Sequence, residues 1–185
     1  TESYQLEITS KGIVVSAPSG AGLFYGFQTL LQLADADTDG TYTLPLVDIK
    51  DAPRFAYRGL HQDVSRHFRT KEFIKKQLDA MARYKLNTLH WHLTDGAGWR
   101  LEIKRYPELT EQAAYRPYPN WKAWWKGGRK YCTKDAPGAD GGYYTQDDAR
   151  EIVEYARQRH ITVIPEIEMP GHSEEVLAVF PQLSC

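Results

Sequence analysis

The feature that most constrains the fold of this chain is a regular alternation of strand-like and helix-like segments that begins at residue 55. Segments 55–65, 87–95 and 161–169 have the apolar and β-branched character of strands, and a segment with helical spacing of its apolar residues follows each of them. Successive parallel strands need a crossover connection, which is usually a helix. The alternation therefore predicts an α/β fold with a parallel sheet.

Each predicted helix has a start signal in the sequence. Thr70 is placed to cap a helix that runs through Leu86. Thr145, with Asp148 three residues later, has the spacing of a capping box. A third helix is expected to begin near Ser173. Every predicted strand is thus followed by its own helix.

Three strand–helix units are too few for a closed barrel, which needs about 250 residues. The units are accompanied by one long loop, 96–142. A sheet of three parallel strands alone would leave its edges and apolar faces uncovered. We therefore predict that residues 54–185 form the first three βα units of a (β/α)8 TIM barrel, rather than a complete small α/β domain.

Residues 1–53 have a different pattern. Segments 4–9 and 13–17 predict a hairpin, followed by an amphipathic helix within 21–34 and a short strand that ends before Pro53. We predict that this region is part of a small α+β domain that precedes the barrel portion.

Composition excludes some classes of partner. The formal net charge is −1 and no basic run is long enough to neutralise phosphates, so we expect no nucleic-acid partner. No apolar run approaches the roughly 20 residues of a membrane span. Five tryptophans and twelve tyrosines are a notable excess. Aromatic rings suit the apolar faces of sugars, and they suit core packing equally well.

Functional side chains of α/β folds gather at the carboxyl ends of the strands. The second predicted strand ends at Asp95, and His172 follows the third. A carboxylate and an imidazole on neighbouring strand ends can pair, and such a pair fixes the tautomer of the imidazole. Each residue alone is also typical of an ordinary turn or loop.

His90 and His92 raise the alternative of a metal site. Residues two apart in a strand share a face, so both imidazoles could approach one zinc or iron ion. The third ligand would be His172 or Glu168, beyond the level of the two histidines. We therefore favour hydrogen-bonded strand histidines and predict no metal and no cofactor. In a regular strand, Asp95 would lie on the opposite face from both.

Arg58 and Glu166 are charged residues within predicted strands. A buried arginine needs an anionic or hydroxyl-rich partner, which for Arg58 is either a ligand or a salt bridge to Asp63 or another carboxylate. Glu166 and Glu168 share one face of the third strand, and for Glu166 we favour an ion pair within the sheet.

Four motifs together resemble a known family. In order, they are YRGLHQDVSRHF, LNTLHWHLTDGAGWR, PELT and YYTQDDAREIVEYARQRHITVIPEIEMPGHS. In order and spacing they resemble the start of the catalytic domain of the family-20 glycoside hydrolases, the β-N-acetylhexosaminidases. The resemblance covers residues 55–185, and residues 1–53 resemble the latter part of the small domain that precedes the barrel in that family.

The resemblance implies a glycosidase that removes terminal N-acetylglucosamine or N-acetylgalactosamine from glycans with retained configuration. Its nucleophile is the substrate's own 2-acetamido oxygen. In the family, an Asp-Glu dipeptide that ends the fourth strand supplies the acetamido-orienting Asp and the general acid. This sequence contains no Asp-Glu dipeptide. We therefore expect the chain to be inactive without the remainder of the barrel, from the same or another chain. The alternative is a non-catalytic carbohydrate-binding fragment or module.

The resemblance also implies roles for individual residues. Asp95 and His172 resemble the pair that hydrogen-bonds toward the catalytic Glu and tunes its proton affinity, so they are predicted as supporting catalytic residues. Arg58 resembles the arginine that binds hydroxyls of the terminal sugar, and Glu168, where many members have Asp, is predicted with it as substrate-binding. Gly96 departs from the Asp of many relatives. The implied setting is periplasmic, secreted or lysosomal.

Overall fold

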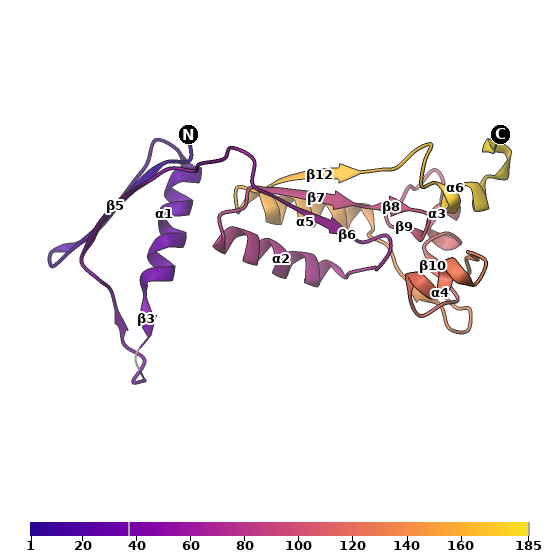
Figure 1. Ribbon diagram of the computed structural model, residues 1–185, viewed down its shortest axis with the longest axis horizontal. Helices are drawn as coiled ribbons and strands as arrows, with labels where there is room; N and C mark the ends of the chain where they lie inside the picture. The colour runs from indigo at the N-terminus through magenta and orange to yellow at the C-terminus, as the bar shows by residue number, and fades with distance from the viewer. Residues whose placement is uncertain (37, 185) are drawn as a thin grey trace.

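The structure is a computed structural model that describes residues 1–36 and 38–184. The molecule is elongated (Figure 1). An antiparallel sheet with one helix forms the N-terminal unit, and a parallel sheet covered by two helices follows it. A cluster of short elements lies at the far end, around the C-terminus. No helix among the described residues is both long and apolar enough to cross a membrane.

The N-terminal unit is built on the predicted hairpin, which the structure confirms. Strands β1 (Tyr4–Thr9) and β2 (Gly12–Ser16) pair in antiparallel fashion, and β5 (Val47–Asp51) pairs with the other edge of β1. Helix α1 (Gly20–Leu33) begins where the Ser19 hydroxyl accepts a hydrogen bond from the Gly22 amide. Alternate side chains of β1 pack with α1 into a small core of Tyr4, Leu6, Ile8 and Tyr25. The short strands β3 (Asp35–Ala36) and β4 (Tyr42–Thr43) pair beyond α1.

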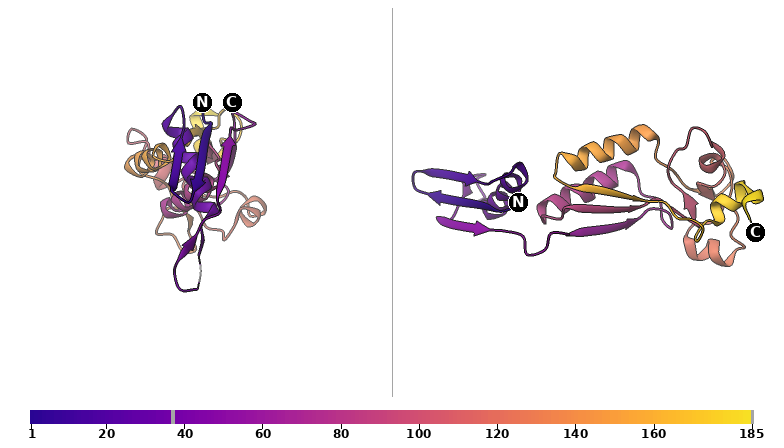
Figure 2. Two further views of the ribbon diagram at one scale, coloured as in Figure 1. Left: turned by 90° about the vertical axis from the view of Figure 1, so that its left-hand side faces the viewer. Right: turned by 90° about the horizontal axis from the view of Figure 1, so that it is seen from above.

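The parallel sheet predicted from the strand–helix alternation is present. Its three strands are β6 (Gly59–Asp63), β7 (Thr88–His92) and β12 (Thr162–Glu166), with β7 in the centre and both pairings parallel. Helices α2 (Lys71–Arg83) and α5 (Gln146–Arg157) both lie on one face of the sheet (Figure 2). Each strand is shorter than its predicted segment.

The predicted caps of these helices are also confirmed. The Thr70 hydroxyl accepts from the Phe73 amide, and Thr145 and Asp148 form a reciprocal capping box. Helix α2 ends at Arg83 rather than at Leu86, because Lys85 adopts a left-handed conformation with φ of 58° that a helix cannot continue.

Only one face of the parallel sheet is covered by the described residues. The core lies between the strands and the two helices, where Val64, Ile74, Leu78, Leu89 and Ile152 are all completely buried. The opposite face carries His61 and Ile164, whose exposed fractions are 50% and 43%. This face and the edges of β6 and β12 are open, as expected for part of a larger sheet.

Residues 96–142, predicted as one long loop, are ordered in the structure. They contain several short elements, namely β9 (Gly98–Trp99), which pairs with β8 (Thr94–Asp95), α3 (Glu108–Glu111), β10 (Tyr115–Arg116), α4 (Trp121–Lys126) and β11 (Asp140–Gly141). The predicted third helix is α6 (Glu174–Val179), followed by a turn of 3-10 helix at Pro181–Leu183. All of these elements gather beyond the carboxyl ends of β6, β7 and β12 (Figure 1).

A buried arginine explains why this segment is compact. The Arg100 side chain has no exposed surface. It donates hydrogen bonds of 2.7–3.1 Å to the carbonyl oxygens of Val64, Ser65 and Gly142, and a shorter one to that of Ala114. These carbonyls belong to three segments that are distant in sequence. A single side chain thus supplies the hydrogen bonds that the buried loop backbone requires.

Candidate active site

Asp95 is the centre of the charged cluster at the carboxyl ends of the parallel strands. Its side chain is only 6% exposed, and its Oδ2 accepts from Arg66 Nη2. The same oxygen lies 3.2 Å from His172 Nδ1 and 3.3 Å from His92 Nε2. The predicted meeting of Asp95 and His172 is therefore present in the structure. Three side chains that can carry positive charge thus surround one oxygen of a buried carboxylate.

Asp95 was expected on the opposite face from His92 only if the strand stayed regular, and the strand does not stay regular. Strand β7 ends at His92, and a separate two-residue strand, Thr94–Asp95, turns back toward Gly98–Trp99. The regular alternation of faces is lost at this break, which allows the Asp95 carboxylate to reach His92 on the sheet interior.

Two neighbouring groups fix the position of Asp95. The Ser65 hydroxyl, which is fully buried, lies 3.1 Å from the Asp95 carbonyl oxygen and 2.8 Å from that of Gly98. The carboxylate of Asp63 accepts from the amides of Ser65 and Arg66, at 2.9 and 3.0 Å. Asp63 thereby shapes the turn after β6 so that Ser65 holds the Asp95 turn.

His92 links Asp95 to Glu166 on the neighbouring strand. Its Nδ1 lies 2.7 Å from Glu166 Oε2, close enough for an ion pair although not aligned as a hydrogen bond. The hydrogen bond with Asp95, reinforced by Glu166, raises the pKa of His92 to about 9. Burial opposes the ionisation of Glu166, but the His92 contact outweighs it, so the pKa of Glu166 is lowered to about 2. A charged imidazolium therefore bridges two carboxylates, and the preferred ion-pair role of Glu166 is confirmed.

Arg66 is a site residue to which the sequence analysis gave no role of its own, although it ends the strand-end segment 63–66. Its Nη1 lies 2.9 Å from Asp63 Oδ2 and 3.1 Å from His92 Nε2, while its Nη2 contacts Asp95. The side chain remains 34% exposed and borders two hollows at the surface. The signal that could have revealed it is its place just after a strand, where functional residues of this fold class gather.

The structure gives Arg58 no place in this site. Arg58 lies at the amino end of β6, and its guanidinium is 2.6 Å from Glu2 and donates to the carbonyl oxygens of Phe55 and Lys85. The prediction that Arg58 binds sugar hydroxyls therefore disagrees with its position. The alternative prediction, a salt bridge of Arg58 to a carboxylate, is met by Glu2, and this bridge joins the parallel sheet to the N-terminal unit. Lys85, 3.3 Å from Asp51, makes a second link between the same two parts.

Glu168 and His172 extend the cluster after β12. The Glu168 amide donates to the Thr94 hydroxyl at 2.8 Å, which ties the end of β12 to the Asp95 strand. A carboxylate oxygen of Glu168 lies within 4.8 Å of a ring nitrogen of His92 and of a carboxylate oxygen of Glu166. The His172 side chain is 59% exposed, so the ring faces solvent while its Nδ1 is directed to Asp95.

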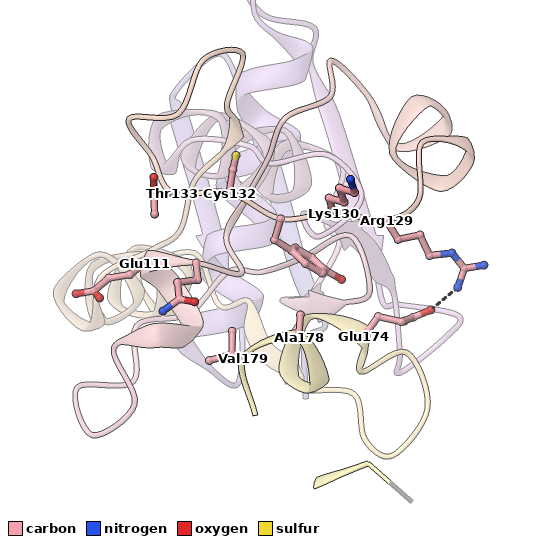
Figure 3. Close-up of a pocket in the computed structure, with 10 residues that line it drawn as sticks. Glu111, Arg129, Lys130, Cys132, Thr133, Glu174, Ala178 and Val179 are labelled. Carbon is pink, nitrogen blue, oxygen red and sulfur yellow. Dashed lines mark hydrogen bonds and ion pairs between the residues drawn. The ribbon is translucent and has the colours of Figure 1, made fainter. Parts of the chain in front are cut away.

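At Gly96 the carboxylate of Glu174 on α6 lies against the bare backbone. A larger residue at this position would have to displace that half-exposed side chain. Glu174 in turn lies 3.1 Å from Arg129, as the close-up of the adjoining cavity shows (Figure 3). An acidic group from α6 thus occupies the space beside Asp95 that the glycine leaves open.

His90 and His92 belong to two different groups of side chains, so they do not approach one common metal position. His90 lies 2.7 Å from Glu166 and its ring packs on His61, while His92 groups with Glu166 and Glu168. Each group places three potential metal-ligand atoms within 4.8 Å of one another. Ion pairs link His61, His90 and His92 to Glu166. The prediction of no metal and no cofactor stays a prediction.

The arrangement is suited to holding and directing a proton. His172 Nδ1 lies 3.2 Å from the buried Asp95 carboxylate, while the rest of the exposed ring faces solvent. Arg66 and the charged His92 both contact the same Asp95 oxygen. Such a carboxylate–imidazole pair orients the imidazole and stabilises a positive charge on it.

Comparison with known families identifies the chain. The profile described as "Glycosyl hydrolase family 20, catalytic domain" matches residues 55–185, and that of "Glycosyl hydrolase family 20, domain 2" matches residues 1–52. The chain belongs to glycosyl hydrolase family 20. The resemblance seen in the four sequence motifs is thereby confirmed.

Curated relatives agree with this membership. The chain is 46% identical to the "Beta-hexosaminidase" of Porphyromonas gingivalis over all of its own length and 22% of the relative, and 42% identical to that of Vibrio furnissii over 97% and 28%. It is also 38% identical to a crystal structure of the family-20 exo-β-N-acetylglucosaminidase of Vibrio harveyi in complex with N-acetylglucosamine. That alignment covers 98% of this chain and 28% of the other, with a TM-score of 0.85. The chain thus spans about a quarter of the length of these relatives.

Proposed function

We propose that the protein to which this chain belongs is a glycoside hydrolase that removes terminal N-acetylhexosamine from glycans. The observation that carries the proposal is the convergence of Arg66, His92 and His172 on the buried Asp95 carboxylate, at the edge where sites of this fold class lie. Membership of glycosyl hydrolase family 20 and the names of the relatives support the choice of sugar.

The three parallel strands form, in this proposal, the first three βα units of a (β/α)8 barrel. The open sheet face and the unpaired edges of β6 and β12 support it, because further strands would cover both. The general acid and the acetamido-orienting Asp would come from the remainder of the barrel, in the same or another chain, since no Asp-Glu dipeptide occurs here.

Asp95 and His172 act in this proposal as positioning residues for the general acid. With Nδ1 committed to Asp95, His172 presents Nε2 to a carboxyl group that would approach from the open side of the sheet. The acid can then hold its proton in a defined direction and share the charge of the pair after the proton has left. The substrate's acetamido oxygen, rather than a second enzyme carboxylate, would attack the anomeric carbon.

Arg66 takes the role that the sequence analysis gave to Arg58. Its guanidinium is held by Asp63 and Asp95 and still borders open hollows, so its remaining donors can bind sugar hydroxyls. Glu168, beside His92 and Glu166, stays proposed as a second substrate-binding residue. The periplasmic, secreted or lysosomal setting is proposed from the family resemblance alone.

Hydrolysis by the full-length protein tests this function. We expect turnover of an aryl N-acetyl-β-glucosaminide or galactosaminide and no turnover of the matching aryl β-glucoside, because only the former carries the acetamido nucleophile. Equal rates on both would refute the substrate-assisted mechanism. The absence of the catalytic dipeptide from residues 1–185 favours the carbohydrate-binding alternative for this chain alone. Measurable binding of N-acetylglucosamine without any turnover by the full-length protein would support that alternative.

A further inference from the structure

Glu175, on helix α6, is a buried carboxyl group that makes no hydrogen bond. Its neighbours Glu174 and Ala178 line the cavity shown in Figure 3, whereas Glu175 itself is completely buried. Neither Oε1 nor Oε2 has a hydrogen-bond partner within the described residues. Glutamates are almost never fully buried unless they are paired. Because a carboxylate in this place would meet no donor, the site favours Glu175 as a neutral acid.

The charges near Glu175 act in the same direction as its burial. Burial contributes most, and the carboxylates of Asp95 and Glu174 add to it, so the pKa of Glu175 is raised to about 8. Its own backbone amide and the Arg100 guanidinium act in the opposite direction without cancelling this shift. Glu175 is therefore neutral at about pH 6 and becomes charged only as the pH passes about 8.

The other neighbours of α6 bring no free cation to Glu175. Burial and the charge of Glu175 raise the pKa of the Tyr131 hydroxyl, so Tyr131 stays neutral. Arg129 is engaged by Glu174 at 3.1 Å, on the side of the cavity. Strand β9 and the 3-10 turn have no titratable side chain, and α3 has only acids, Glu108 and Glu111. Within the described part of the chain, an ionised Glu175 would thus lack a hydrogen-bonded counter-ion.

Helix α6 is directly connected to the residue that meets Asp95. His172 lies three positions before Glu175, and its Nδ1 is 3.2 Å from Asp95 Oδ2. Ser173, between them, is buried, and its hydroxyl donates to the Gly171 carbonyl oxygen at 3.0 Å. Apolar residues of α6 and of the turn after it pack on a small core, namely Val176, Val179 and Phe180 on Trp99, Leu109 and Ala113. A movement of α6 would therefore also move His172.

We propose that Glu175 is a positioning residue that acts through His172. As a neutral acid it lets α6 pack against the strand ends, which holds His172 beside Asp95. Its ionisation would place an unpaired anion in the interior near Asp95, so α6 moves outward to bring the carboxylate to water, and His172 moves with it. What is lost is the contact that directs the general acid, rather than a contact to the sugar. This assignment rests on the proposed hydrolase function.

The ratio of two rates at each pH isolates the titration of Glu175. The kcat on methyl N-acetyl-β-glucosaminide is measured for full-length Glu175→Gln and for the unaltered full-length protein, so groups that titrate in both proteins cancel. We expect equal rates at about pH 6 and a rate about tenfold higher for the variant at about pH 9. One pH unit above a pKa of about 8, only roughly a tenth of Glu175 remains neutral.

A second substrate separates positioning from a general loosening of the site. The dinitrophenyl glycoside of the same sugar has a leaving group that departs with little help from an acid. The ratio of the two rates on this substrate should therefore change by less than about twofold between the two pH values. An equal rise of the ratio on both substrates would mean that ionised Glu175 disturbs the whole site, and it would overturn the positioning role.

Two further variants keep the test decisive. Glu111→Gln removes an exposed acid of the neighbouring helix α3, and its rate relative to the unaltered protein should not depend on pH. Glu175→Met, with an apolar side chain of similar length, should behave as Glu175→Gln does. Misfolding of both Glu175 variants would overturn the proposal, because a site that holds a neutral carboxyl group tolerates a neutral side chain of that size.

The same measurements distinguish this proposal from the hydrolase function. A ratio on the methyl glycoside that is constant or falls with pH would overturn the role of Glu175 and leave the hydrolase function intact. Absence of turnover of both substrates by the unaltered protein at every pH would refute the hydrolase function and the positioning role with it.

Discussion

Replacement of His92 by Gln should change how stability depends on pH. His92 bridges Asp95 and Glu166, and its pKa is raised to about 9 from an ordinary value of 6.5. A raised pKa in the folded state means that the protonated ring stabilises the protein. This contribution is fully present below about pH 6.5 and is lost as the pH rises through about 9.

The size of the effect follows from the two pKa values. Each pKa unit corresponds to about 1.4 kcal/mol, so the charged His92 contributes about 3 kcal/mol. Its side chain is only 4% exposed, so solvent screens the interaction little. His92→Gln should therefore lower the free energy of unfolding much more at about pH 6 than at about pH 10, and the two losses should differ by about 3 kcal/mol.

Urea unfolding of the full-length protein at both pH values measures this difference. Groups other than His92 titrate in both proteins and largely cancel in the comparison. His67→Gln is the matched control, because it removes an exposed histidine of the same region and should show no such pH dependence. A loss of stability in His92→Gln that is equal at both pH values would refute the bridging role of the charged imidazole.

Three further predictions concern Asp95, Arg100 and Glu175. Asp95→Asn should lower kcat on an aryl N-acetyl-β-glucosaminide by about 100-fold with little change in KM, because it weakens proton transfer rather than sugar binding; an unchanged kcat would contradict this. Arg100→Met should cost about 3–5 kcal/mol in thermal unfolding, since it leaves buried carbonyls unpaired, whereas the exposed control Arg105→Met should cost less than about 1. Burial raises the pKa of Glu175 to about 8, so stability contributed by its protonated form is lost between about pH 4.5 and 8. Glu175→Gln should therefore be more stable than the unaltered protein at about pH 8 but not at about pH 4.5, and equal gains at both would contradict it.

The strands and helices were accessible from the sequence because they follow local rules. The hairpin of the N-terminal unit, the caps at Thr70 and Thr145 and the parallel order of β6, β7 and β12 all depend on spacing and capping chemistry within short segments. The family resemblance was equally accessible, since its motifs are contiguous. The meeting of Asp95 with His172 followed from the rule that strand ends share one edge of a sheet.

The remaining features depend on contacts that no local pattern encodes. The break of β7 after His92 turns Asp95 inward, and regular alternation predicts the opposite. Arg100 orders residues 96–142 through carbonyls from three distant segments. Arg58 and Arg66 both flank strand β6, and only the direction of the strand decides which of them reaches the site.

The configuration of the released sugar tests the central claim most directly. The full-length protein is mixed with an aryl N-acetyl-β-glucosaminide, and the anomeric protons are followed by NMR before mutarotation. Participation of the acetamido group predicts that the β-anomer of N-acetylglucosamine appears first. First appearance of the α-anomer, or no release of the sugar, would contradict the account.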